Sequence, residues 1–172
     1  DPWAVLGAFQ RAEVVFMVIG GLARVIRGAD EVTWGVDICP SLVDANRPRV
    51  QTAPDELRAE IVPTRRSRTA SEAADQQPVL EFSSVAGSVK IVGTPAGVPR
   101  GYNALRPGAT IEHLGGGLRP SVASTADLIT MAAARGLPKD IELVPQLQRM
   151  LQLEASLRAP YGVTLNRHDP TA

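Results

Sequence analysis

Hydrophobic spacing at the start of the chain predicts a helix, a buried strand and a second helix. Residues 3–12 (WAVLGAFQRA) repeat apolar side chains every three or four positions, as an amphipathic helix does. Residues 14–20 (VVFMVIG) form a continuous apolar and β-branched run, which is typical of a buried central strand. A Gly-Gly pair then leads into a short helix over 21–28 (GLARVIRG).

The next segment, residues 31–39 (EVTWGVDIC), alternates strictly and predicts a strand with two different faces. Successive side chains of a strand point to opposite faces. One face would carry Val32, Trp34, Val36 and Ile38. The other would carry Thr33, Gly35, Asp37 and Cys39. We therefore look for function on the face that holds Asp37.

The remaining spacing predicts further strands and then two helices. In order, we expect a helix over 46–60, a polar loop over 63–78, strands over 79–84 and 88–93, an edge hairpin over 110–123, and helices over 124–136 and 138–158. Ser124 or Thr125 caps the first of these two helices, and Gly136 ends it.

This order predicts an α/β (α+β) fold, in which a mixed β-sheet core has flanking helices and a C-terminal helical segment. We expect residues 1–122 to form the core, 123–158 to pack on it as the helical segment, and 159–172 to be a loose tail.

Composition supports a globular protein: hydrophobic residues make up 44% of the 172 positions and charged residues 21%. Eighteen basic and eighteen acidic residues cancel, so the whole chain presents no strong field for nucleic acid. The single cysteine, Cys39, excludes an internal disulfide and fits a reducing compartment. No apolar run is long enough to span a bilayer. We therefore expect a cytoplasmic protein with no membrane partner.

Five segments, in this order, give the chain a resemblance to a known family. They are VIGGLARVIRG, VTWGVDI, DANRPRVQTAPDELRA, GSVKIVGTPAGVPRGYNAL and PSVASTADLITMAAARGLPKDIELVPQL, and the match covers roughly residues 14–150. The chain resembles the minimal nucleotidyltransferase fold of the polymerase-β superfamily, and within it the toxin-associated AbiEii/MenT type. The resemblance implies transfer of an NMP from an NTP to a hydroxyl of tRNA or of a protein, with Mg²⁺ or Mn²⁺. It also implies a toxin–antitoxin system, with a cognate antitoxin protein as a partner.

Nucleotidyl transfer develops negative charge on phosphate oxygens, and two metal ions held by neighbouring carboxylates neutralise that charge. Carboxylates at positions i and i+2 of a strand lie on one face, about 7 Å apart at the backbone. The resemblance assigns Asp37 to metal binding and catalysis, and Gly20 and Gly21 to the nucleotide phosphates. It assigns Thr33 to supporting the triphosphate or to receiving a regulatory phosphate.

Three positions depart from the pattern of that family. Gly35 stands where the family has its first aspartate, Lys90 where it has its third carboxylate, and Ala132 where it often has a lysine. Glu81, on the neighbouring predicted strand, is the best substitute metal ligand, and Lys90 is a catalytic candidate that would supply positive charge in place of a metal.

Two interpretations follow from these departures. The protein is either an active nucleotidyltransferase with a rebuilt site, or a catalytically degenerate homologue that binds nucleotide, RNA or a partner protein. The sequence also leaves open whether Gly35 is natural or engineered.

Basic residues outside the strand are the remaining candidates. Arg24, on the helix after the Gly-Gly turn, is a candidate for nucleotide phosphates. Substrate or RNA contacts are expected from Arg65, Arg66, Arg68, Arg100, Lys139 and Asp140. The simpler interpretation of the first three is a solvated loop. For the last two it is the opening of the final helix, where an aspartate suits the helix dipole.

Overall fold

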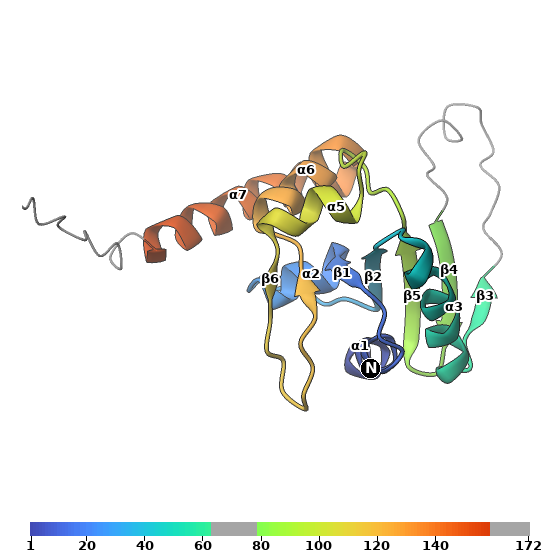
Figure 1. The fold of residues 1–172 in the computed structure, drawn as a ribbon. Helices are drawn as coiled ribbons and strands as arrows, with labels where there is room; N and C mark the ends of the chain where they lie inside the picture. The colour runs from blue at the N-terminus through green and yellow to red at the C-terminus, as the bar shows by residue number, and fades with distance from the viewer. Residues whose placement is uncertain (63–78, 159–172) are drawn as a thin grey trace, which may run out of the picture.

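The computed structural model describes residues 1–62 and 79–158, and it confirms the expected α+β fold with a mixed sheet (Figure 1). Within these residues seven strands form one sheet in the order β3-β4-β5-β2-β1-β7-β6. The strands are β1 (Phe16–Ile19), β2 (Gly35–Pro40), β3 (Glu60–Val62), β4 (Val79–Ser84), β5 (Gly87–Val92), β6 (Thr110–Ile111) and β7 (Ser121–Val122). The α-helices are α1 (Pro2–Arg11), α2 (Gly20–Ile26), α3 (Arg47–Glu56), α5 (Tyr102–Leu105), α6 (Thr125–Arg135) and α7 (Pro138–Arg158).

Strand β1 lies inside the sheet, which explains its unbroken apolar sequence. It pairs antiparallel with β2 and parallel with β7, and all four of its side chains are buried. β2 also pairs parallel with β5, which pairs antiparallel with β4. β6 and β7 form the expected hairpin, with β6 at the edge of the sheet.

Local capping fixes the helices on either side of this sheet. The Asp1 carboxylate accepts hydrogen bonds from the backbone N–H groups of Trp3 and Ala4, at 3.0 and 3.2 Å, and so begins α1. Ser124 Oγ accepts from the Asp127 N–H at 3.1 Å to begin α6, and Gly136 ends α6 in a left-handed conformation with φ 60°.

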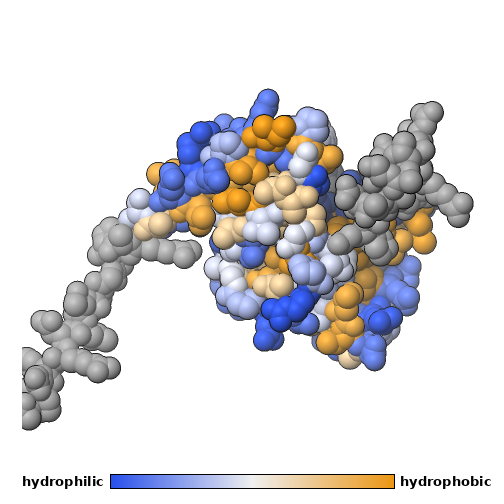
Figure 2. Space-filling model, turned by 90° about the horizontal axis from the view of Figure 1, so that it is seen from above, coloured by the Kyte–Doolittle hydropathy of each residue, from blue (hydrophilic) through white to orange (hydrophobic). Residues whose placement is uncertain are grey.

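Helices α6 and α7 lie side by side, above the sheet in the view of Figure 1. Leu128 and Met131 of α6 and Leu147 of α7 belong to the same buried cluster as β1. Ile141, Leu153 and Leu157 of α7 are exposed. Apolar and hydrophilic residues are intermixed on the face of the molecule shown in Figure 2. Among the described helices, none is both long and apolar enough to cross a membrane.

The predicted strand over 31–39 is wrong in its first half, because β2 begins only at Gly35. Gly35 pairs with Ser88, and β5 begins one residue earlier at Gly87, so residues 31–33 extend beyond the start of β5. Val32 and Trp34, which the alternation placed on one face with Val36 and Ile38, are 79% and 88% exposed, whereas Val36 and Ile38 are buried. Thr33 therefore does not lie on the strand that carries Asp37.

The predicted helix over 46–60 is also too long. α3 ends at Glu56, and Arg58 adopts a left-handed φ of 48°, which a helix cannot continue through. The chain then forms β3, whose Glu60 pairs with Ser83 of β4. In α1, Trp3 begins the apolar repeat of the predicted helix, yet it is 44% exposed, while Leu6 and Phe9 of the same repeat are buried.

Candidate active site

Asp37 lies on β2 where β1 ends and α2 begins. It is the register partner of Ile19, and the next residue, Gly20, has a left-handed φ of +65°. A Cβ atom at Gly20 would lie 2.9 Å from Asp37 Cγ and closer still to Oδ2. Glycine is therefore required at this position for two reasons: the backbone conformation is left-handed, and the Asp37 carboxylate leaves no room for a Cβ atom.

Gly21 and Thr33 form the second close contact of the turn. A Cβ atom at Gly21 would lie 2.7 Å from Thr33 Oγ1. The Thr33 hydroxyl donates a hydrogen bond to the Gly35 carbonyl at 3.1 Å. Thr33 thus lies beside the Gly-Gly turn, although it reaches this place from an irregular segment and not from a strand.

A lysine stands beside Asp37 in the sheet. Asp37 is the register partner of Lys90 on β5, and Lys90 is the register partner of Glu81 on β4. Paired residues of neighbouring strands point to the same face of a sheet. Lys90 Nζ lies 4.0 Å from Glu81 Oε1. The three side chains form a row in which Glu81 is two strands away from Asp37, about 10 Å at the backbone.

Ser88 occupies the space beside Gly35. A Cβ atom at Gly35 would lie 3.1 Å from the Ser88 carbonyl oxygen and closer still to Ser88 Oγ. A side chain at this position would therefore force Ser88 to move. Ser88 was not predictable from the sequence, because strand register alone brings it to Gly35.

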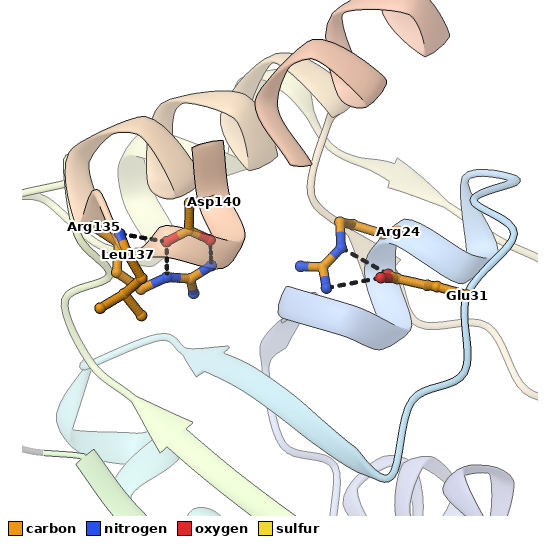
Figure 3. A network of polar contacts seen from close by, with 5 residues as sticks. All are labelled: Arg24, Glu31, Arg135, Leu137 and Asp140. Carbon is orange, nitrogen blue, oxygen red and sulfur yellow. Dashed lines mark hydrogen bonds and ion pairs between the residues drawn. The ribbon is translucent and has the colours of Figure 1, made fainter. Parts of the chain in front are cut away.

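A polar cleft of about 190 Å³ opens between α2 with its following segment and the α6–α7 turn. Its lining is Arg24, Glu31, Arg135, Lys139, Glu142, Leu143 and Gln146. Arg24 Nε and Nη2 donate to the two Glu31 carboxylate oxygens at 2.7 and 3.2 Å. Arg135 Nε donates to Asp140 Oδ2 at 2.8 Å. The two ion pairs face one another across the cleft (Figure 3).

The carboxylate of Asp140, which we expected to contact the substrate, accepts hydrogen bonds from within the protein. The residue is 1% exposed, and besides Arg135 it accepts a hydrogen bond from the Leu137 N–H at 3.1 Å. Hydrogen bonding from Arg135 lowers the pKa of Asp140. The expectation of direct substrate contact is therefore corrected: Asp140 holds the α6–α7 turn and orients Arg135. Arg135 was not predicted as a site residue, because its only signal in the sequence was its spacing from Asp140.

The charges of four cations act on the carboxylate of Asp37. Burial raises its pKa, and the positive charges of Lys90, Arg135, Arg24 and Lys139 act in the opposite direction. The chain has only two lysines, and both belong to this group. We call these four residues the cation group.

The donor set around Asp37 does not fit a metal clamp. Two-metal catalysis needs carboxylates close enough to bridge the ions. Over residues 1–62 and 79–158, no three His, Cys, Asp or Glu side chains gather at one point. The register partner of Asp37 on β5 is Lys90, which carries an ammonium group, and Glu81 lies one strand farther away on β4. We therefore derive no step through Mg²⁺ or Mn²⁺ at this site.

The other predicted residues lie elsewhere. Arg100 is exposed between β5 and α5 and is not in the cation group. Ala132 is buried in α6. Arg65, Arg66 and Arg68 lie outside the described residues. A second cavity, of about 210 Å³, lies near Phe16, at the opposite end of β1 from the Gly-Gly turn.

Comparison with known proteins identifies the fold. No family model and no curated protein matches the sequence. The solution structure of the antibiotic-resistance factor ANT(2'')-Ia, an aminoglycoside nucleotidyltransferase, is similar to this one with a TM-score of 0.55. The two chains are 13% identical over 92% of this chain and 89% of that one. At this identity the likeness concerns the fold alone, and the AbiEii/MenT type stays a prediction. The chain has a nucleotidyltransferase-like fold.

Proposed function

We propose that this protein binds a nucleoside triphosphate in the cleft lined by Arg24, Arg135 and Lys139, with its phosphates directed toward Asp37 and the Gly-Gly turn. It would then be a nucleotide-binding member of its fold without two-metal catalysis. The observation that carries the proposal is the placement of the cation group: Lys90 is the register partner of Asp37, and the other three residues line one cleft. A triphosphate carries several negative charges and requires such groups. The departures at Gly35 and Lys90 favour binding over catalysis, because the strand face offers one carboxylate where two are needed.

The two arginines support this proposal by their geometry. Each guanidinium now holds a carboxylate, Arg24 that of Glu31 and Arg135 that of Asp140. The planar fork that binds a carboxylate also binds a phosphate. Glu31 belongs to the irregular segment before β2, so we expect a phosphate to replace it on Arg24. Asp140 is buried, and we expect it to stay in place and hold Arg135 toward the ligand.

The second candidate function is transfer of an NMP to a hydroxyl of tRNA or of a protein. One observation favours it: burial raises the pKa of Asp37, and a carboxylate of raised pKa suits a general base. Metal dependence, a tRNA acceptor and a cognate antitoxin rest on the sequence resemblance alone, and they belong to this second candidate function.

Calorimetric titration with ATP, GTP, CTP and UTP tests the first proposal. We expect at least one of them to bind, and Arg24→Gln to weaken it about tenfold through loss of one charge-assisted interaction. Arg49→Gln is the matched control, because Arg49 is an exposed arginine of α3 whose ion pair is with Glu13. Binding of none of the four nucleotides would refute the proposal.

A label-transfer assay separates the two candidates. α-³²P-labelled NTPs are incubated with the protein and total tRNA, with Mg²⁺ or Mn²⁺ added. Nucleotide binding without labelling supports the binding module. Labelling of tRNA or of the protein, abolished by Asp37→Ala, supports the transferase instead.

A further inference from the structure

We infer that this site takes the polyphosphate chain of its nucleotide as the metal-free anion, with Lys90 as a fixed positive charge beside Asp37. This inference rests on the proposed function and deepens it, because it names the form in which the ligand binds.

The position of Lys90 is the first argument. The register places Lys90 directly beside Asp37, with Glu81 on its other side. Its side chain is 45% exposed, so the ammonium group is accessible to a ligand. A divalent cation approaching Asp37 would meet this ammonium on the same face of the sheet, and the like charges repel. The positive charge of Lys90 therefore disfavours binding of a metal ion by Asp37 and favours binding of a phosphate at the same place.

The packing at Gly35 is the second argument. Residue 35 points to the same face as Asp37, two positions earlier on β2. Ser88 fills the space that a side chain at this position would need. β2 can therefore offer a single carboxylate, and a magnesium ion held by one carboxylate would depend on water and on the phosphates for its other ligands.

The supply of positive charge is the third argument. Two of the cation group are engaged in close ion pairs, Arg24 with Glu31 and Arg135 with Asp140. The two lysines are less engaged. Lys90 meets Glu81 only at 4.0 Å, and among the described residues no carboxylate lies within that distance of Lys139. Both ammonium groups can thus donate to phosphate oxygens, which is the role that a divalent cation otherwise fills.

Titration of the full chain with ATP, with excess MgCl₂ and with excess EDTA, tests the inference. We expect ATP to bind in EDTA at least as tightly as in MgCl₂, and inorganic triphosphate to compete with it in EDTA. Lys90→Met should weaken binding in EDTA about tenfold, the effect of losing one charge-assisted hydrogen bond. Arg49→Met controls for loss of an exposed cation outside the cleft.

A second measurement uses the scarcity of lysine. Because Lys90 and Lys139 are the only lysines, acetylation by an amine reagent followed by mass spectrometry reports on this site without background from other lysines. We expect ATP in EDTA to protect both side chains.

The outcomes separate this inference from the proposed function. ATP binding in MgCl₂ that disappears in EDTA would overturn the inference and leave nucleotide binding intact. Unchanged acetylation of Lys90 in the ATP complex would likewise overturn it. No binding of any nucleotide under either condition would refute the proposed function, and the inference with it.

Discussion

Replacing Gly20 by alanine should destabilise the protein by about 2–3 kcal/mol. A left-handed conformation costs a residue with a Cβ atom roughly 1–2 kcal/mol, and the φ of +65° places Gly20 in that region. The new methyl group would also lie 2.9 Å from Asp37 Cγ. Turning the Asp37 side chain away from its rotamer adds about 0.5–1.5 kcal/mol.

The matched control is Gly116→Ala. Gly116 has a similar φ of +55°, but a Cβ atom there would meet no atom within 4 Å. The control should therefore lose only the backbone part, roughly 1–2 kcal/mol. The difference between the two variants measures the contact with Asp37 and not the general cost of replacing a glycine.

Urea unfolding followed by circular dichroism measures both variants. In thermal unfolding, a loss of 2–3 kcal/mol should lower Tm by about 4–12 °C for a chain of this size. The Gly20→Ala/Asp37→Ala double variant should recover part of the loss, because the carboxylate is gone. Equal losses for the Gly20 and Gly116 variants, or no coupling to Asp37, would refute the close contact on which the site is built.

The remaining predictions concern charge and packing. Burial raises the folded-state pKa of Asp37, so above pH 3.8 the folded state binds more protons than the unfolded state. The free energy of unfolding therefore falls as pH rises toward the folded pKa. Asp37→Asn should be more stable than the parent in urea at pH 7. The pKa of Asp140 is lowered, so its contribution is present above pH 3.8 and is lost as pH falls toward the folded pKa; Asp140→Asn should flatten that loss in acid unfolding. Arg27→Ala should cost about 2–4 kcal/mol in urea, because Arg27 donates to the Val122 and Ala123 carbonyls, both at 3.0 Å, and a change under 0.5 kcal/mol would contradict this. Gly35→Asp should destabilise the chain, and Ser88→Gly should relieve that loss in the double variant; additive effects of the two changes would argue against the packing described.

Local features of the fold were predictable from the sequence. The apolar run of residues 14–20 predicted a central strand, and β1 is buried on both faces. The capping residue Ser124 and the terminating residue Gly136 bound α6 where expected. These signals depend on near neighbours in the chain, through side-chain period and through hydrogen bonds to the adjacent backbone. The position of Asp37 on the polar face of a strand was predictable in the same way, from the alternation of its neighbours in the chain.

The environment of Asp37 was decided by tertiary structure. Alternation continued back to Val32, but β2 starts at Gly35 because a strand extends only where a partner strand lies beside it. No local pattern predicts that Lys90 lies next to Asp37 in register, or that Ser88 packs against Gly35.

The effect of the Arg135 charge on Asp37 also depended on the tertiary structure, because α6 and the turn that Asp140 holds must fold over the sheet first. Such contacts join residues tens of positions apart, and strand order, register and helix packing fix them. The sequence by itself thus determined a nucleotidyltransferase-like order of elements and one carboxylate on its β2 face. The folded chain decided that this carboxylate lies among cations, because residues distant in sequence converge only when the sheet and its helices assemble.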